Sequence, residues 1–371
     1  MVPVPDHGIS VTYRVVADSN TVEARALDIC VEQTVEVTES LWRDPRIADR
    51  VVGRVESIED AGDGVFAVRI HYPGAVVGVE LTQVLNAVYG NVSMKTGIRV
   101  MAVEPSPGLA AAFPGPGFGI SGLRARLGIE RRPLVVSALK PIGRSVGDLA
   151  GFAADMVRGG VDIIKDDHGI GNQAVCPFHE RVEACVEAMA AAGAPSGRRS
   201  LYFPTVTGPV DEVLDRALFA KAAGAGGLLI SPLVTGLDQV RLLVGETGLP
   251  VMAHPALAGA FFASPDHGMA PSALLGTLMR LAGSDLVIFP TWGGRFPFTR
   301  EQCLSLDRSL KSDLHGLRRS MPVPAGGLSL EQIPSQLKVY GDDVAFLVGS
   351  ALYEQSPDLA ANAAFFLSLV Q

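Results

Sequence analysis

From residue 133 onward the chain is a series of short apolar runs separated by amphipathic stretches. Segments such as 148–160 and 210–226 are rich in Ala and Leu and carry their polar residues at helical spacing. Short apolar runs that alternate with helices are typical of parallel strands buried on both faces. Eight of them predict an α/β fold of the (β/α)8 TIM-barrel type. The runs cover residues 133–140, 161–167, 201–207, 227–231, 250–254, 285–291, 322–327 and 344–350.

A doubly wound open sheet is the alternative to the barrel. A sheet of this kind is expected to carry a Gly-rich dinucleotide-binding turn after its first strand. The segment SALKPIGRS, which follows the first run, is not a turn of this kind. The barrel is therefore the preferred architecture.

The first 125 residues follow a different pattern. Segments 11–16, 50–58 and 65–73 alternate apolar and polar residues, as half-exposed antiparallel strands do. Helical spacing begins near Ala26 and again over 81–92, and the Pro- and Gly-rich stretch 104–120 is typical of a connector. This pattern predicts a small α+β, ferredoxin-like N-terminal domain over 1–125, followed by the barrel over 126–371.

Polar residues and glycines follow nearly all of the barrel runs. The carboxyl ends of barrel strands meet at one face, which carries the active site in this fold. Glycines after the last two strands fit a phosphate cradle, in which backbone N–H groups bind the anion. The residues at these ends are Lys140, Lys165, Asp167, His168, Thr205, Thr207, Ser231, His254, Thr291, Arg295, Gly326, Gly327, Gly349 and Ser350.

The second run has the densest charge of these ends. Val161, Ile163 and Ile164 lead directly into Lys165, Asp166, Asp167 and His168. An unpaired buried charge costs several kcal/mol, so a buried group of this kind is either paired or bound to a metal. Oxygen-rich ligands suit a hard cation such as Mg²⁺. The alternative is a surface strand end whose charges are solvated.

Composition narrows the function. The net charge of −8 argues against nucleic acid as a partner. No apolar run reaches the roughly 18–20 residues that span a bilayer, and the N-terminus lacks the pattern of a secretory signal. Cys30, Cys176, Cys185 and Cys303 are scattered without a CxxC pair, so neither a zinc site nor a disulfide framework is predicted. We expect a cytoplasmic enzyme with no membrane partner.

Several motifs resemble the large subunit of ribulose-bisphosphate carboxylase. They are KPIG (140–143), GGVDIIKDDHG (159–169), the strand end at His254, TWGGRF (291–296) and AGG (325–327). FPGPGFGI, before the first barrel run, is similar to that family's linker. The segment YGNVSMK (89–95) is similar to one whose asparagine reaches the neighbouring subunit's site. The similarity covers most of the chain and is weakest in the first 50 residues.

The resemblance implies a role for each matching residue. Lys165 matches the lysine that reacts with CO₂ to form a carbamate, which ligates Mg²⁺ and can act as a general base. Asp167 and His168 match the other two ligand positions, although the carboxylases have glutamate where this chain has His168. Neutral imidazole still binds divalent metals, but the site loses a negative charge, and His168 could instead carry a proton. Lys140 matches the lysine beside the enediolate and is suited to proton transfer. His254 is a further catalytic candidate.

The resemblance also implies an assembly. Asn91 and Glu32 match residues that complete the site of the neighbouring subunit, so we expect a homodimer or a multiple of dimers.

Three departures from the carboxylases bear on the reaction. Ile142, Arg295 and Pro255 stand where the carboxylases have a lysine, the mobile-loop lysine and a phosphate-binding arginine. The glycine cradle remains, with Gly326, Gly327, Gly349 and Ser350 as its candidate residues. The resemblance therefore implies a phosphorylated, sugar-derived substrate with one phosphate, and a form IV protein that does not fix CO₂.

Several reactions share the enediolate that such a site stabilises. Our first expectation is decarboxylation of a 3-oxo sugar-acid phosphate such as 3-oxo-isoapionate 4-phosphate. The alternatives are an isomerase or enolase acting on an intermediate of the methylthioribulose-1-phosphate type, and a transcarboxylase or hydrolase of the oxo-isoapionate phosphate. A binding protein without catalysis is the alternative outside the enzymes, against which the presence of Lys140 and Lys165 argues.

Overall fold

The computed structural model describes residues 7–193 and 199–371, and its chain forms two compact units. The first holds the described residues up to Pro114 together with Leu257–Ala282 and Asp313–Leu317. The second holds the rest. No helix in the described residues is long and apolar enough to cross a bilayer.

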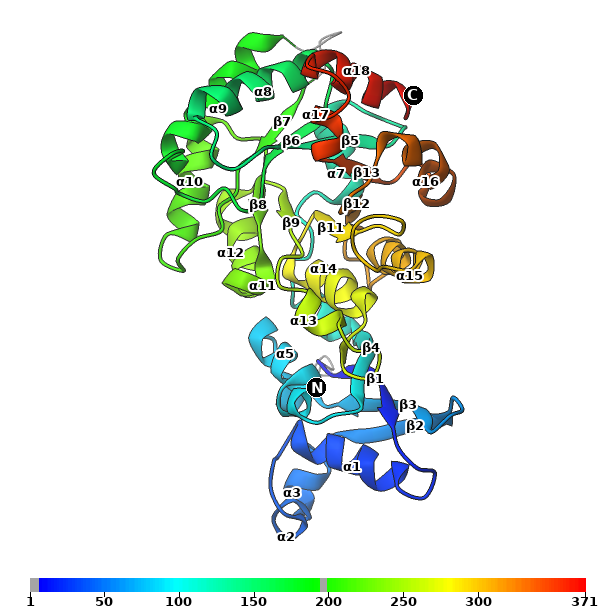
Figure 1. Ribbon diagram of the computed structural model, residues 1–371. Helices are drawn as coiled ribbons and strands as arrows, with labels where there is room; N and C mark the ends of the chain where they lie inside the picture. Colours follow the sequence, from blue (N-terminus) through cyan, green and yellow to red (C-terminus); the bar gives the residue numbers. More distant parts are fainter. Residues whose placement is uncertain (1–6, 194–198) are drawn as a thin grey trace. The chain divides into compact units, whose positions relative to one another are not determined.

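The first unit is built on a mixed sheet with the strand order β10-β4-β1-β3-β2. Strands β1 to β4 of this sheet are labelled in Figure 1. The predicted antiparallel strands are present, because β1 pairs with both β3 and β4 and β2 pairs with β3. Strand β4 was not predicted, and β10 joins it in parallel from the chain between two barrel strands. The strands are β1 (Ile9–Val16), β2 (Arg54–Asp60), β3 (Val65–Tyr72), β4 (Ile98–Pro105) and β10 (Gly268–Met269). The helices are α1 (Val22–Glu32), α2 (Glu39–Trp42), α3 (Pro45–Ala48), α4 (Gly74–Val77), α5 (Leu81–Tyr89), η1 (Asn91–Met94), α6 (Pro107–Ala111), α13 (Gly259–Phe262), η3 (Ser272–Leu278) and α14 (Met279–Ala282).

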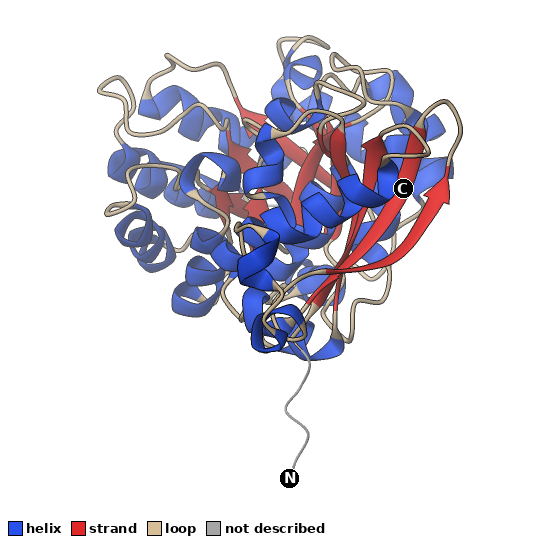
Figure 2. Cartoon of the chain, turned by 90° about the horizontal axis from the view of Figure 1, so that it is seen from below, coloured by secondary structure: helices blue, strands red, loops and turns tan. Residues whose placement is uncertain are grey.

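The second unit is the predicted α/β barrel, with strands inside and helices outside (Figure 2). A strand lies at every predicted barrel run, and within each of two sheets the neighbouring strands pair in parallel. The strands are β5 (Leu134–Leu139), β6 (Ile163–Asp166), β7 (Leu201–Phe203), β8 (Leu228–Ile230), β9 (Val251–Ala253), β11 (Leu286–Pro290), β12 (Met321–Ala325) and β13 (Ala345–Val348). The helices are α7 (Gly119–Leu127), α8 (Val146–Arg158), α9 (Phe178–Ala192), α10 (Val213–Ala223), α11 (Pro232–Thr235), α12 (Asp238–Thr247), α15 (Arg300–Lys311), η4 (Leu330–Gln332), α16 (Ile333–Tyr340), α17 (Ser350–Tyr353) and α18 (Leu359–Ser368).

Hydrogen bonding divides the barrel into two sheets, ordered β12-β11-β9-β8 and β13-β5-β6-β7. A bridge between Thr205 and Leu229 joins the sheets on one side. On the other side β12 and β13 are not joined by a ladder of hydrogen bonds, and two prolines of β12 explain this gap. The Met321 N–H donates to the Asp285 carbonyl, so odd-numbered residues of β12 face β11 and even-numbered ones face β13. Pro322 and Pro324 therefore present no N–H to β13, and no ladder forms there.

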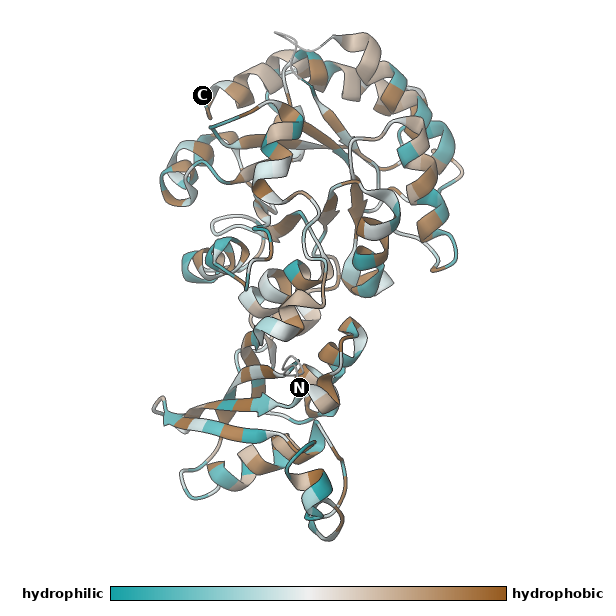
Figure 3. Ribbon diagram, turned by 180° about the vertical axis from the view of Figure 1, so that it is seen from behind, coloured by the Kyte–Doolittle hydropathy of each residue, from teal (hydrophilic) through white to brown (hydrophobic). Residues whose placement is uncertain are grey.

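Alternation along the strands decides which side chains enter the barrel. Residues of odd number on β6, β7, β8, β12 and β13, and of even number on β5, β9 and β11, make up its apolar core, which is brown in Figure 3. Helix α7 contributes Leu123 and Leu127 to this core. The same parity carries Lys140, Lys165, Asp167, His254 and Gly349 to the inner side at the strand ends.

Asp285 ties the start of α7 to the barrel. Its carboxylate accepts hydrogen bonds from the N–H groups of Phe118 (2.6 Å), Gly119 (2.7 Å) and Val251 (3.0 Å). Asp285→Ala leaves these buried donors without a partner, so we expect the free energy of unfolding to fall by about 2–4 kcal/mol. Asp285→Asn, which keeps one acceptor oxygen, should lose less. Urea unfolding of the two variants checks this, and equal losses would contradict it.

Candidate active site

Lys165 lies at the end of β6, on the inner side of the barrel. Only 2% of the residue is exposed, and its Nζ donates to the carbonyl of Asp166 at 2.8 Å. Burial, opposed by the charge of Asp167, lowers the pKa of Lys165 to about 8. A substantial fraction of this amine is therefore neutral near physiological pH, as a nucleophile or proton acceptor must be.

Asp167 connects the charged groups of the site. Its Oδ2 accepts from Lys140 Nζ at 2.6 Å, and its Oδ1 accepts from the backbone N–H of His168 at 2.9 Å. His168 Nδ1 is also 2.9 Å from Oδ1. Burial alone would raise the pKa of Asp167, but the hydrogen bonds of His168 and Lys140 and the charges of both lysines hold it well below its usual range. Asp167 is therefore a carboxylate that keeps Lys140 in place.

His254 follows β9 and faces this pair. Its ring stacks on that of His168, with centroids 4.0 Å apart and planes 8° from parallel. The Ala256 N–H donates to Nδ1 at 3.1 Å, so the neutral ring carries its proton on Nε2. Burial and the charge of Lys165 put the pKa of His254 well below its ordinary value. His254 is thus a neutral hydrogen-bond donor. The His168 side chain lies nearer to solvent, with 47% of it exposed.

Glycines at the ends of β12 and β13 lie where the sequence predicts a phosphate cradle. Gly326 and Gly327 have φ of +79° and +102°, a region that favours glycine. A Cβ on Gly327 would lie 2.9 Å from the Arg295 backbone nitrogen, and this nitrogen donates to the Gly326 carbonyl at 2.7 Å. A Cβ on Gly349 would lie 3.5 Å from Lys140 Cε. Glycine is therefore needed at 326 and 327 for the turn to pack against Phe296 and Arg295, whereas Gly349 has room for a Cβ.

Arg295 and Ser350 are less enclosed than the lysines. The Arg295 side chain is exposed, and its guanidinium lies over the Phe296 ring at 5.4 Å. Ser350 is exposed at the first position of α17. The structure therefore groups Lys140, Lys165, Asp167, His168 and His254, and places Arg295 against the glycine turn.

Asn91 and Glu32 meet in the first unit. Asn91 Nδ2 donates to Glu32 Oε1 at 3.1 Å. Lys95, which sequence analysis did not single out, pairs with Glu32 Oε2 at 2.5 Å and lowers the pKa of this carboxyl. Tyr353 was also missed: it donates to the Ala138 carbonyl at 2.9 Å and accepts from the Lys140 N–H at 3.2 Å. No pattern in the sequence marks either residue.

Within the described ranges 7–193 and 199–371, no group of three or more His, Cys, Asp and Glu side chains could hold a metal ion. Asp167 and His168 are adjacent at the site, so a third ligand would have to come from another residue type. Cys30, Cys176, Cys185 and Cys303 are buried free thiols, and Cys303 Sγ contacts the Pro290 carbonyl at 3.5 Å.

Comparison with known proteins identifies the family. Residues 119–363 match the model of the ribulose bisphosphate carboxylase large chain, catalytic domain. The chain belongs to this family. It is 42% identical to ribulose bisphosphate carboxylase-like protein 1 of Rhodopseudomonas palustris, over 98% of this chain and 97% of that one. It is 38% identical to 5-methylthioribulose-1-phosphate isomerase of Rhodospirillum rubrum, over 97% of this chain and 95% of that one.

A solved structure of the family has the same fold. The crystal structure of a Rubisco-like protein from Rhodopseudomonas palustris superimposes with a TM-score of 0.89 at 36% identity, over 98% of this chain and 97% of that one. The chain is thus a Rubisco-like member of the family, as its motifs indicated.

Proposed function

We propose that this Rubisco-like protein is a proton-transfer enzyme of the isomerase or enolase class, acting on a monophosphorylated sugar derivative without fixing CO₂. The observation that carries the proposal is the inner group at the strand ends. It combines a buried lysine whose pKa is lowered to about 8 with the Lys140–Asp167 ion pair. Groups with such shifted pKa values, gathered at the catalytic face of a barrel, are suited to acid–base chemistry.

Each residue has a task in this reaction. The backbone N–H groups near Gly326, Gly327, Gly349 and Ser350 hold the phosphate. His254 donates a hydrogen bond from Nε2–H to a substrate oxygen that gains charge, and Lys140 returns a proton to carbon. Asp167 keeps Lys140 directed into the site, since its Oδ2 accepts from Lys140 Nζ at 2.6 Å.

The residues present fit a divalent cation if Lys165 supplies a ligand. Asp167 and His168 offer a carboxylate and an imidazole, and a neutral Lys165 amine can react with CO₂ to form a carbamate. Mg²⁺ bound by these three groups would act as a Lewis acid toward the enediolate, and the carbamate would be available as a proton acceptor.

We place isomerisation before decarboxylation because the relative that is 38% identical over nearly the whole chain is named an isomerase. Decarboxylation, the first expectation from the sequence, stays a second candidate. It needs no base to form the enediolate and only a proton donor afterwards, which Lys140 provides.

Turnover in D₂O separates these reactions. We expect methylthioribulose 1-phosphate, incubated with the protein, Mg²⁺ and bicarbonate, to isomerise with deuterium from solvent on carbon and no release of CO₂, followed by NMR. Release of CO₂ from 3-oxo-isoapionate 4-phosphate would favour the second candidate instead. Carboxylation of ribulose bisphosphate would contradict both, and absence of any exchange would favour a binding protein.

We also propose a homodimer or a multiple of dimers, in which the partner subunit supplies the Asn91–Glu32 pair to the barrel. A dimer by light scattering at micromolar concentration is the expected result. Asn91→Ala and Glu32→Gln should lower turnover without changing the dimer. A fully active monomer would contradict the proposal.

A further inference from the structure

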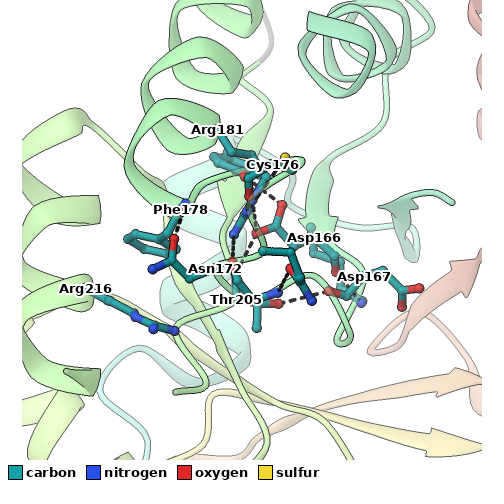
Figure 4. Close-up of polar contacts among 12 residues, drawn as sticks. Asp166, Asp167, Asn172, Cys176, Phe178, Arg181, Thr205 and Arg216 are labelled. Atoms are coloured by element: carbon teal, nitrogen blue, oxygen red, sulfur yellow. Dashed lines mark hydrogen bonds and ion pairs between the residues drawn. The ribbon is translucent and has the colours of Figure 1, made fainter. Parts of the chain in front are cut away.

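Asp166, between Lys165 and Asp167, points to the opposite side of β6 and ends in a buried network (Figure 4). Its Oδ2 accepts from Arg181 Nε at 3.1 Å and from the Thr205 N–H at 2.9 Å. Its Oδ1 accepts from Tyr202 Oη at 2.7 Å. Asp166 and Arg181 have fully buried side chains.

Arg181, on α9, also holds the chain that follows His168. Its Nη2 donates to the Gly171 carbonyl and its Nη1 to the Cys176 carbonyl, both at 2.9 Å. The guanidinium packs on the Phe178 ring, 5.5 Å from the centroid. One side chain thus fixes the end of β6 and both ends of the loop 171–176.

A second arginine continues the network to the next strand end. Arg216 on α10 lies 5.7 Å from the same Phe178 centroid and donates to the Thr207 carbonyl at 3.0 Å. Thr207 Oγ1 in turn accepts from the Ser231 N–H at 3.0 Å. Hydrogen bonds on the outer side of the barrel therefore hold the chain that follows β6, β7 and β8.

The outer network around Asp166 also acts on the inner side of β6, where Lys165 and Asp167 lie. Lys165 Nζ donates to the Asp166 carbonyl and Thr205 Oγ1 donates to the Asp167 carbonyl (3.2 Å), so the peptide units around Asp166 set the direction of both inner side chains. A buried ion pair is often no more stabilising than an apolar pair of the same volume. Fold stability alone is thus a weak reason for a charged pair one residue from Lys165 and from Asp167.

We propose that the Asp166–Arg181 pair is a positioning device for the reaction, and that Arg181 is a positioning residue for Lys165, Asp167 and His168. The inference rests on the proposed function. Misplacing reacting groups by about 1 Å can cost about 100-fold in rate, so loss of the pair should lower kcat by about 10–100-fold. KM should change little, because the phosphate is held elsewhere, at the glycine turns.

The test separates positioning from stability. Arg181→Met leaves Asp166 as a lone buried charge and is expected to be less stable. The double variant Asp166→Asn/Arg181→Met removes both charges and should regain much of that stability. If the pair positions the site, the double variant stays 10–100-fold slow in kcat, whereas Arg181→Lys recovers part of the rate. If the pair only supports the fold, kcat returns together with stability, and the proposal is overturned.

Arg124→Met is the matched control. Arg124 is also a buried, ion-paired arginine of the barrel unit, but it bonds Asp343 and the Arg132 carbonyl at the opposite ends of the strands. At a temperature where all variants are folded, it should keep kcat within about twofold of the parent protein. Equal losses of kcat in Arg124→Met and in the double variant would overturn the proposal.

Amide hydrogen exchange gives a readout that needs no substrate. In the double variant exchange should rise over residues 163–171 and not in the segment before β13. Unchanged exchange over 163–171 would overturn the proposal even if no substrate were turned over. Absence of proton exchange by the parent protein would instead contradict the proposed function, so the two failures are distinguishable.

Discussion

Replacement of Lys165 by methionine should abolish turnover, with a loss of about 10⁴-fold or more, while the barrel stays folded. The loss is large because one change removes both the nucleophile that CO₂ would modify and a ligand of the proposed cation site. Methionine fills a similar volume in a place where only 2% of the lysine is exposed. Lys221→Met, an exposed lysine on α10, is the control. A Lys165→Met protein that keeps a tenth of the rate would contradict the assignment.

The stability of Lys165→Met relative to the parent protein should depend on pH. The pKa of Lys165 is about 8 in the folded chain against 10.5 ordinarily, so unfolding is favoured by protonation. This penalty is fully present below pH 8, declines between pH 8 and 10.5, and is absent above. Lys165→Met should therefore be more stable than the parent protein at pH 7, and the difference should shrink at pH 9. Thermal unfolding at both pH values measures it.

The barrel could be predicted because strands buried on both faces leave continuous apolar runs in the sequence. Their alternation also places Lys140, Lys165 and His254 on the inner side once the barrel is assumed. The prolines of β12 are visible in the sequence as well. Predicting that they prevent a ladder between β12 and β13 requires knowing which neighbouring strand each residue faces.

Other features depend on contacts between distant segments. Strand β4 has exposed residues at irregular positions, and its partner β10 is a pair of residues in the chain between β9 and β11. The sequence likewise shows that Asp166 faces away from Lys165, but not that Tyr202 and Arg181 meet it. The stack of His168 on His254 depends on the path of two loops, for which no periodic pattern exists.

Lys140→Met should lower kcat by about 10²–10⁴-fold, the usual contribution of a positioned proton donor. Removing the ammonium also takes away a hydrogen bond and a charge that lower the pKa of Asp167, so this pKa should rise. The fold should be little affected, because the Lys140 side chain is partly exposed.

Isotope exchange decides which step fails in Lys140→Met. If Lys140 returns the proton to carbon, the variant still removes the substrate proton, and exchange with solvent deuterium outpaces product formation. In the parent protein the two rates should be similar. Lys338→Met, an exposed lysine on α16, should leave both rates unchanged. If exchange and product formation fell together in Lys140→Met, Lys140 would act before the enediolate forms, by removing the proton or by holding the substrate oxygen, and the role of proton donor would pass to another residue of the inner group.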